Sequence, residues 1–313
     1  MAGTKRAGYR LATYQTKEGP RAGIVIGDEV FDAAKLTRKP AYATVAGILA
    51  DWKAAESTLK KAVAGAAKSR APHQPLRKTK LLAPIPHPPT IFCAGANYAD
   101  HAAAMARKAG QPEPRDPHEL GLKPWHFIKA AGTITAPGAT VKAAHYANNL
   151  DWEIELAAVI GRPARDVPLA KALSYVAGYT AANDLSARDR GRRPGVEDTS
   201  FFKMDWTKHK SFDGSCPIGP WITPASDIAD PQNLGMKLWV NGDLKQDSNT
   251  GKMLFSLAEQ IAQLSINMTL HPGDIVLTGT PAGTGAESGE FLKAGDVVKI
   301  WIEGIGEFEN RIA

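Results

Sequence analysis

Alternating apolar and polar positions recur along the chain and predict more strands than helices. Residues 8–34 hold short apolar runs separated by Glu-Gly-Pro and Gly-Asp, which is typical of a small β-rich unit. Asn241-Gly242 lies between alternating apolar residues and indicates a two-residue type I′ hairpin. Other strand-like segments are "TIFCAGANY", "LDWEIELAAVIG", "VAGYTAANDLSA", "MKLWVNGDLKQD", "DIVLTGTP" and "VVKIWIEG". The pattern predicts an α+β fold that is mostly β.

Helical spacing of apolar residues is confined to a few segments. Residues 43–66 place Val45, Ile48 and Leu59 near a period of 3.6, with Lys and Glu between them, and predict one amphipathic helix. An Ala-rich helix is expected over "ADHAAAMARKAG", and shorter ones around 168–174 and 255–267. Helices are therefore expected to cover a predominantly β core.

Two proline-rich stretches interrupt this pattern. The stretch "APHQPLRKTKLLAPIPHPP" contains six prolines, which disfavour helix, and we place a domain boundary there. The expected division is a small N-terminal domain over residues 1–82 and a larger domain over 83–313. Residues 111–124, "QPEPRDPHELGLKP", hold four further prolines and predict a mobile loop that acts as a lid.

Composition fits a soluble globular protein, with 43% hydrophobic and 22% charged residues in 313. Two cysteines, Cys93 and Cys216, are too few for a disulfide framework and match no zinc pattern. The first twenty residues lack a secretory apolar core, and no apolar run could span a membrane, so we expect a cytoplasmic protein; an organelle transit peptide is the alternative. The net charge of +6 permits contact with nucleic acid or with small anionic substrates.

Two carboxylates stand out in "LDWEIELAAVIG". Side chains alternate faces along a strand, so Glu153 and Glu155 point the same way. Asp184 ends another apolar run, "VAGYTAAND". Three clustered carboxylates form an all-oxygen ligand set that favours Mg²⁺ or Mn²⁺ over Zn²⁺. The competing interpretation is a solvated face of an antiparallel sheet.

The sequence resembles the fumarylacetoacetate hydrolase superfamily across roughly residues 83–313, and the N-terminal region resembles the small domain that many members carry. The resemblance rests on seven motifs in order: "GANYADHAAAM", "HFIKAAGTIT", "LDWEIELAAVIG", "VAGYTAANDLSARD", "KSFDGSCPIGPW", "VNGDLKQDSNT" and "HPGDIVLTGTPAGTG".

This resemblance implies a β-rich roll in which Glu153, Glu155 and Asp184 hold one Mg²⁺ or Mn²⁺. It implies a substrate that is a small anionic 2-oxo or dicarbonyl acid of the kind met in aromatic compound catabolism, and a homodimer. The expected reaction is metal-dependent hydrolysis of a C–C bond beside a carbonyl. The alternative is an isomerase, tautomerase or decarboxylase that uses the same enolate, and a third possibility is a non-catalytic binding protein.

The resemblance also implies roles for individual residues. His101 in "NYADH" matches the general base, and Lys210 in "KSFDG" matches a lysine that holds the substrate oxyanion. Lys129, Arg188 and Thr280 match substrate-binding positions.

Two positions depart from the family pattern. Relatives of the bacterial type carry a Glu three residues after the histidine, where this chain has Ala104, so Glu113, Asp116 or Glu119 would have to orient His101 instead. Relatives often carry Gln shortly after the arginine, where this chain has Gly191, which indicates an altered substituent end of the pocket.

Two motifs suggest nucleotides or nucleic acid only superficially. The arginines at 188, 190, 192 and 193 lack interleaved aromatic residues, and we expect a solvated loop instead. "TGTPAGTG" lacks the lysine of a P-loop. We therefore expect no nucleic-acid partner and no membrane association.

Overall fold

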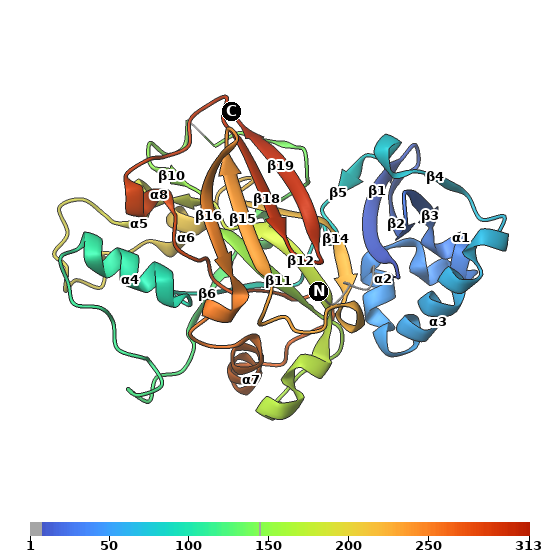
Figure 1. Cartoon of the computed structure of the whole chain (residues 1–313), viewed down its shortest axis with the longest axis horizontal. Coiled ribbons are helices and arrows are strands. Elements are labelled where there is room, and N and C mark those ends of the chain that lie inside the picture. Colours follow the sequence, from blue (N-terminus) through green and yellow to red (C-terminus); the bar gives the residue numbers. More distant parts are fainter. Residues whose placement is uncertain (1–7, 144) are drawn as a thin grey trace, which may run out of the picture.

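The computed structural model describes residues 8–143 and 145–313. It contains two large sheets with helices outside them (Figure 1), and it confirms the expected α+β fold that is mostly β. The larger sheet has twelve strands in the order β4-β3-β2-β1-β14-β12-β11-β17-β6-β7, with β5 beside β1 and β8 beside β14. Its strands are β1 (Arg10–Thr16), β2 (Gly19–Ile26), β3 (Glu29–Asp32), β4 (His73–Pro75), β5 (Leu81–Leu82), β6 (Ile91–Ala94), β7 (His126–Lys129), β8 (Ile134–Thr135), β11 (Ile154–Ile160), β12 (Val176–Asn183), β14 (Cys216–Pro224) and β17 (Ile275–Leu277).

The second sheet has five strands in the order β16-β15-β18-β19-β9. They are β9 (Thr140–Val141), β15 (Gly235–Val240), β16 (Asp243–Asn249), β18 (Val297–Ile302) and β19 (Gly306–Ile312), while β10 (Leu150–Asp151) and β13 (Ser186–Ala187) form a separate pair. Side chains from alternate positions of β11, including Leu156 and Ala158, form one hydrophobic core with residues of β15 and β18. The opposite face of β11, which carries Ala157 and Val159, belongs to a second core. The strand is thus buried on both faces.

The N-terminal unit is joined to the rest of the fold through this second core. β1 pairs antiparallel with β14, where Leu11 lies opposite Ile222. Ile48 and Leu59 from the N-terminal helices belong to the same buried cluster as Val159. The proline-rich segment therefore separates two parts of the chain whose hydrophobic core is continuous, and a division at residue 82 stays a prediction.

The helices differ in part from the sequence pattern. The single helix predicted over 43–66 is divided at Asp51, whose φ of −115° and ψ of 27° are not helical. The helix expected around 168–174 is a 3₁₀ helix, Leu169–Tyr175. The α-helices are α1 (Ala33–Thr37), α2 (Val45–Ala50), α3 (Trp52–Ala64), α4 (Ala99–Lys108), α5 (Arg188–Gly191), α6 (Trp206–Lys210), α7 (Leu257–Asn267) and α8 (Gly285–Ser288).

Local sequence signals explain where several elements begin and turn. Ser256 and Glu259 form a reciprocal capping box at the start of α7, which satisfies backbone donors that a helix otherwise leaves unpaired. Asn241 and Gly242 have φ values of 53° and 89° between β15 and β16, which confirms the predicted type I′ hairpin. Residues 111–124 contain no helix or strand, as expected of a loop. No helix in the described ranges has the length and apolar character needed to cross a bilayer.

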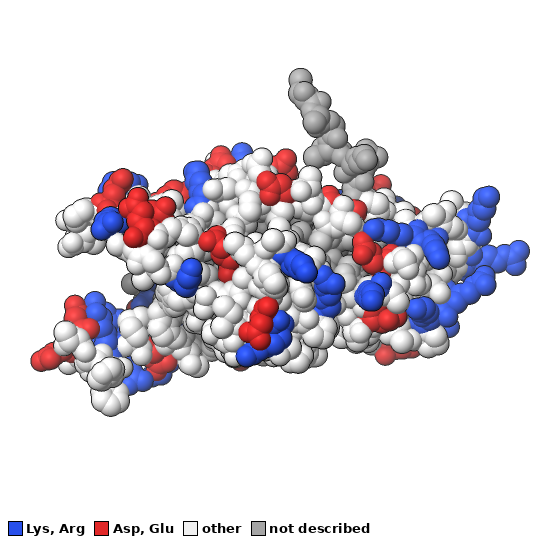
Figure 2. Space-filling model, turned by 90° about the horizontal axis from the view of Figure 1, so that it is seen from below, with Lys and Arg blue, Asp and Glu red and all other residues white. Residues whose placement is uncertain are grey.

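The positive charge of the protein is concentrated in its N-terminal part. Residues 8–82 hold 14 Lys and Arg against 6 Asp and Glu, whereas residues 83–313 hold 22 against 26. Figure 2 shows lysines and arginines gathered at the end of the molecule that this unit forms. A surface hollow of about 540 Å³ there is lined by Lys35, Arg38, Lys61, Lys68 and Arg70, among others. The net charge of +6 therefore comes from the N-terminal part of the chain, whereas residues 83–313, which contain the three carboxylates, carry a negative net charge.

Replacing Leu11 by Ala tests the continuity of the core. Leu11 is fully buried at the junction of β1 and β14, so its truncation should destabilise the protein by about 2–5 kcal/mol. Leu244→Ala, at a position that is 48% exposed, is the matched control and should cost under about 0.5 kcal/mol. Urea unfolding followed by circular dichroism should show one transition that shifts as a whole. A separate early transition that alone responds to Leu11→Ala would show that the N-terminal unit unfolds independently.

Candidate active site

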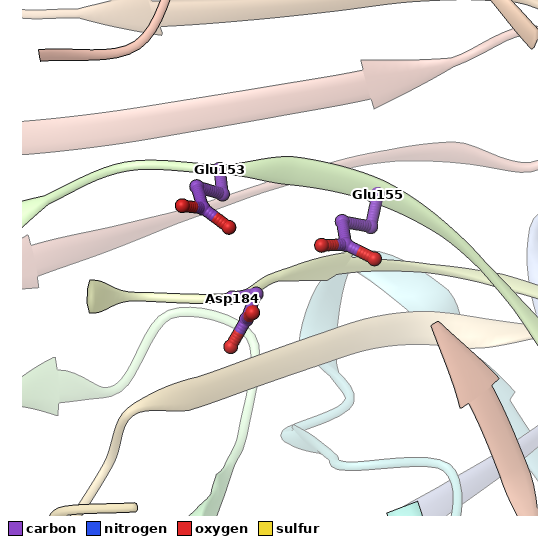
Figure 3. A group of neighbouring side chains, drawn as sticks. All are labelled: Glu153, Glu155 and Asp184. Atoms are coloured by element: carbon purple, nitrogen blue, oxygen red, sulfur yellow. The ribbon is translucent and has the colours of Figure 1, made fainter. Parts of the chain in front are cut away.

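Three carboxylates converge where β11 begins and β12 ends. The two strands are antiparallel, with Ile154 opposite Asn183, so Glu153 and Asp184 are brought side by side. The Asp184 backbone N–H donates to the Glu153 carbonyl at 2.9 Å, which fixes this crossing. Glu153 and Glu155 project from the same side of one strand, and Asp184 comes from its neighbour (Figure 3). One oxygen from each of the three lies within 4.8 Å of the others.

The carboxylate triad (Glu153, Glu155 and Asp184) is buried. Its members are 5%, 1% and 1% exposed, and every residue of β11 is buried as well. The alternative of a solvated sheet face is therefore wrong. Burial of like charges is costly unless positive groups compensate them, so the surroundings of the triad determine what it can hold.

Two lysines and one arginine provide most of that compensation. Lys210 ends α6 and its Nζ donates to Glu153 at 2.7 Å and to Asp184 at 2.6 Å. Lys129 ends β7 and donates to Asp184 and to the Leu185 carbonyl. Arg188 begins α5 and donates to Glu153 and, at 2.8 Å, to Asp151. Burial alone would raise the pKa of Glu153, but Lys210 and Arg188 hold this pKa below its ordinary value.

Glu155 is the carboxylate that these cations leave uncompensated. Within the described residues it forms no ion pair and accepts one hydrogen bond, from the Gly279 N–H at 2.6 Å. Burial, followed by repulsion from Asp184 and Glu153, raises the pKa of Glu155 well above its ordinary value. Four buried carboxylates, Asp151 included, thus face three cations, and one negative charge is in excess when all four are ionised. The hard oxygen donors and this excess charge fit a divalent cation such as Mg²⁺ or Mn²⁺.

His101 on α4 lines the same cavity as the triad, and its partner is a residue that the sequence analysis missed. The His101 Nδ1 lies 2.5 Å from the Oε1 of Glu287 on α8. Glu287 also accepts a hydrogen bond from the Gly283 N–H at 2.8 Å, which holds its carboxylate in place. Because a carboxylate only accepts, Nδ1 carries a proton, and in the neutral imidazole the lone pair is then on Nε2. Glu287 thereby fixes the orientation of the imidazole in the cavity.

The three loop carboxylates that the sequence offered as partners for His101 lie elsewhere. Glu113 pairs with Arg107, Glu119 pairs with Arg115, and Asp116 pairs with His118; all these pairs are exposed or nearly so. Glu287 follows "TGTPAGTG" and is 186 residues from His101 in the chain. The only signal for it in the sequence was a carboxylate just beyond the last family motif, and spacing alone could not join it to His101.

Asp151 is a second residue that the sequence analysis did not single out. It is fully buried and accepts hydrogen bonds from the Gly285 and Ala286 N–H groups, at 2.6 and 2.9 Å, and from Arg188. Burial raises the pKa of this carboxyl despite Arg188. Asp151 thereby ties α8, which carries Glu287, to the arginine beside the triad.

Thr280 lies in the turn after β17 and is 5% exposed. Gln246, a further residue the sequence did not reveal, donates to the Thr280 hydroxyl at 2.9 Å and to the Pro281 carbonyl at 2.8 Å. Gly279 has a φ of 94°, and a Cβ there would lie 2.9 Å from that of Asn97. This turn therefore needs glycine. It directs the Gly279 N–H to Glu155 and places Thr280 in the lining of the cavity over the triad.

The cavity over the triad has a volume of about 160 Å³. Of the residues singled out from the sequence, His101, Arg188, Lys210 and Thr280 line it together with the triad. Lys129 does not line it, because its buried ammonium lies behind Asp184. The other polar and aromatic lining residues are Asn97, Trp125, Phe127, Trp206 and His209.

Comparison with known proteins agrees with this fold and site. Residues 90–313 match the family model described as fumarylacetoacetate (FAA) hydrolase C-terminal. A mitochondrial oxaloacetate tautomerase from Xenopus laevis is 39% identical over 234 residues, which cover 74% of this chain and 68% of the relative. One from Rattus norvegicus is 35% identical and covers 97% of this chain and 91% of the relative. The chain belongs to the fumarylacetoacetate hydrolase family, as the motif series indicated.

Solved structures of the family superpose on nearly the whole chain. Fumarylacetoacetate hydrolase from Exiguobacterium antarcticum has a TM-score of 0.74 and 29% identity, with 97% of this chain and 99% of that chain covered. Maleylpyruvate hydrolase from Sphingobium sp. SYK-6, in complex with manganese(II) and pyruvate, has a TM-score of 0.72 and 30% identity, with 97% and 98% covered. A manganese-bound neighbour and the carboxylate triad together indicate divalent-metal binding in this family fold.

Replacing Glu155 by Gln tests the excess charge. In metal-free protein the raised pKa means that the protonated form of Glu155 contributes stability below the ordinary value of 4.5, and that this contribution is lost as pH rises through the folded-state pKa. Between about pH 5 and pH 8 in EDTA, the variant should therefore become progressively more stable than the wild type. Manganese should raise the melting temperature of the wild type and have little effect on the variant.

Glu307→Gln, at an exposed position paired with Lys299, is the control and should leave both the pH dependence and the manganese effect unchanged. A Glu155→Gln variant that is less stable than wild type across this pH range, yet still stabilised by manganese, would contradict the assignment.

Proposed function

We propose that this protein is a divalent-metal-dependent enzyme that interconverts the keto and enol forms of a small 2-oxo dicarboxylic acid such as oxaloacetate. The observation that carries the proposal is one small cavity bounded by both the carboxylate triad and a carboxylate-oriented histidine. The reaction needs a base beside the substrate carbon and a positive environment at the substrate oxygens, and both are available here.

Glu153, Glu155 and Asp184 would hold Mg²⁺ or Mn²⁺. When bound, such a cation supplies a Lewis acid for the carboxylate and keto oxygens of the substrate. Lys129 contacts Asp184 from behind and positions that ligand, so it is assigned a supporting role in place of direct substrate binding. Arg188 and Lys210 keep Glu153 ionised, and Thr280 offers a hydroxyl to the substrate side of the cavity.

His101 would carry out the proton transfer. Its Nε2 accepts the proton from the carbon next to the keto group; the electron pair of that C–H bond forms the C=C bond, and the π pair of the C=O bond moves to the keto oxygen. Glu287 stabilises the imidazolium that forms, because it already accepts from Nδ1. Return of the proton to the oxygen yields the enol, and the reverse sequence yields the keto form, so no other reactant is consumed.

Tautomerisation is preferred to hydrolysis for two reasons. The relatives from Xenopus laevis and Rattus norvegicus carry the tautomerase name at 39% and 35% identity. Tautomerisation also needs only a base and a positive environment at the substrate oxygens, whereas hydrolysis needs in addition a water placed for attack. Hydrolysis of a C–C bond beside a carbonyl remains the second candidate, because an oriented histidine can equally activate water and a maleylpyruvate hydrolase shares the fold.

Oxaloacetate enol decay, followed by ultraviolet absorbance with manganese present, tests the base. His101→Ala should lower the catalysed rate by about 10²- to 10⁴-fold, since a general base is removed. Glu287→Gln should lower this rate by about 10- to 100-fold, because the imidazole loses the carboxylate that orients it.

Glu113→Gln, in the exposed pair with Arg107, is the control and should retain the wild-type rate. A parallel assay of pyruvate release from maleylpyruvate distinguishes hydrolysis, the second candidate, from tautomerisation. Rapid metal-dependent pyruvate release, with oxaloacetate enol decay no faster than in buffer, would replace tautomerisation by hydrolysis.

A further inference from the structure

His209 is a buried histidine in the cavity for which the proposed reaction provides no role. It precedes Lys210 on α6, is 6% exposed and lines the cavity with the triad. Both of its ring nitrogens are buried without a hydrogen-bond partner among the described residues. Leaving buried polar atoms unpaired is costly, so a side chain in this state points to a ligand that completes its hydrogen bonds.

Gly191 on the neighbouring helix leaves the space that the imidazole of His209 occupies. A Cβ at Gly191, at the end of α5, would lie 2.9 Å from the His209 Cγ and 3.0 Å from its Nδ1. Any larger residue at 191 would therefore collide with the imidazole as it now lies. Gly191 therefore leaves the room in which the imidazole lies against the cavity.

We infer that His209 binds an anionic oxygen at the far end of a short substrate, namely the second carboxylate of a small 2-oxo dicarboxylic acid. This inference rests on the proposed function for where the 2-oxo acid end of the substrate binds. It adds the chemical group that the pocket selects at the other end of the substrate.

The charges around His209 favour an anion. Burial, and then the nearby Lys210 and Arg188, lower the pKa of His209 to about 3, so the ring is neutral and offers one N–H donor. With a divalent cation held by the triad, the four carboxylates and three cations around it would carry a net positive charge, which would attract a carboxylate and repel a positively charged substituent. A neutral histidine donates to a carboxylate without needing a carboxylate partner of its own.

Aromatic side chains limit the length of that substituent. The Trp206 ring centroid lies 5.6 Å from those of Trp125 and His209, and 5.1 Å from that of Phe127. These rings line the cavity beside His209, so a single carboxylate on a short tail is accommodated better than a long chain.

Calorimetry on manganese-loaded protein tests the inference with three probes. Oxalate reports only on the metal end, 3,3-difluorooxaloacetate adds the second carboxylate without an enolisable C–H, and 3,3-difluoro-2-oxobutanoate has a methyl group in place of that carboxylate. His209→Ala should weaken difluorooxaloacetate binding by roughly tenfold and leave oxalate and the oxobutanoate within about twofold. With oxaloacetate as substrate, KM should rise more than kcat falls.

Three further variants distinguish recognition from packing. His209→Asn keeps a donor and should lose less affinity than His209→Ala, which also covers the case in which the alanine variant folds poorly. Gly191→Ala should weaken difluorooxaloacetate binding by displacing the ring, although it removes no polar group. The double variant Gly191→Gln with His209→Ala should recover much of the affinity.

The possible failures are distinguishable. Wild-type protein that binds oxalate no better with manganese than without it would overturn the proposed function itself. Manganese-dependent oxalate binding, combined with a preference for difluorooxaloacetate that His209→Ala and Gly191→Ala leave unchanged, would overturn only the role of His209. An equal loss for all three probes would assign His209 to packing.

Discussion

The structure depends on the electrostatic balance of a buried group of carboxylates. Glu153, Asp184 and Asp151 are each paired with Lys210, Lys129 or Arg188, and those cations are themselves buried or nearly so, whereas Glu155 has only a backbone donor. Removing a member of these ion pairs leaves a buried charge short of a partner, which costs on the order of 3–5 kcal/mol in comparable sites; Glu155, which has no ion partner among the described residues, is the exception. The paired carboxylates and cations therefore stabilise one another only when all are present. The remaining negative charge favours a divalent cation in the pocket.

The fold brings these groups together through antiparallel pairing and short helices. β11 and β12 place the triad, α6 and β7 bring Lys210 and Lys129 to it, and α5 brings Arg188. Asp151 and Gln246 then connect this centre to the segment that holds Thr280 and Glu287. His101 reaches the same cavity from α4, whose first turn is fixed where Asp100 accepts from Ser248 and from the Ala282 N–H. The carboxylate triad, His101 and Thr280 thus share one hydrogen-bonded framework.

The sequence revealed what depends on local pattern and missed what depends on distant contacts. The triad was visible because two acids at a spacing of two interrupt an apolar strand, and the hairpin at Asn241-Gly242 was visible because its turn needs positive φ values. Glu287 and His209 were invisible because each acquires its role from a partner in a remote segment or on another helix. Apolar spacing likewise indicated helix over 43–66 but could not locate the break at Asp51, since the same spacing serves two short helices.

The most direct measurement is a crystal structure of the protein grown with manganese, with anomalous scattering recorded to locate the ion. The account predicts one strong peak within bonding distance of an oxygen from each of Glu153, Glu155 and Asp184, with Lys210 moved away from at least one of its present carboxylate partners. Absence of a peak there at millimolar manganese, with Glu155 still bonded only to the Gly279 N–H, would contradict it.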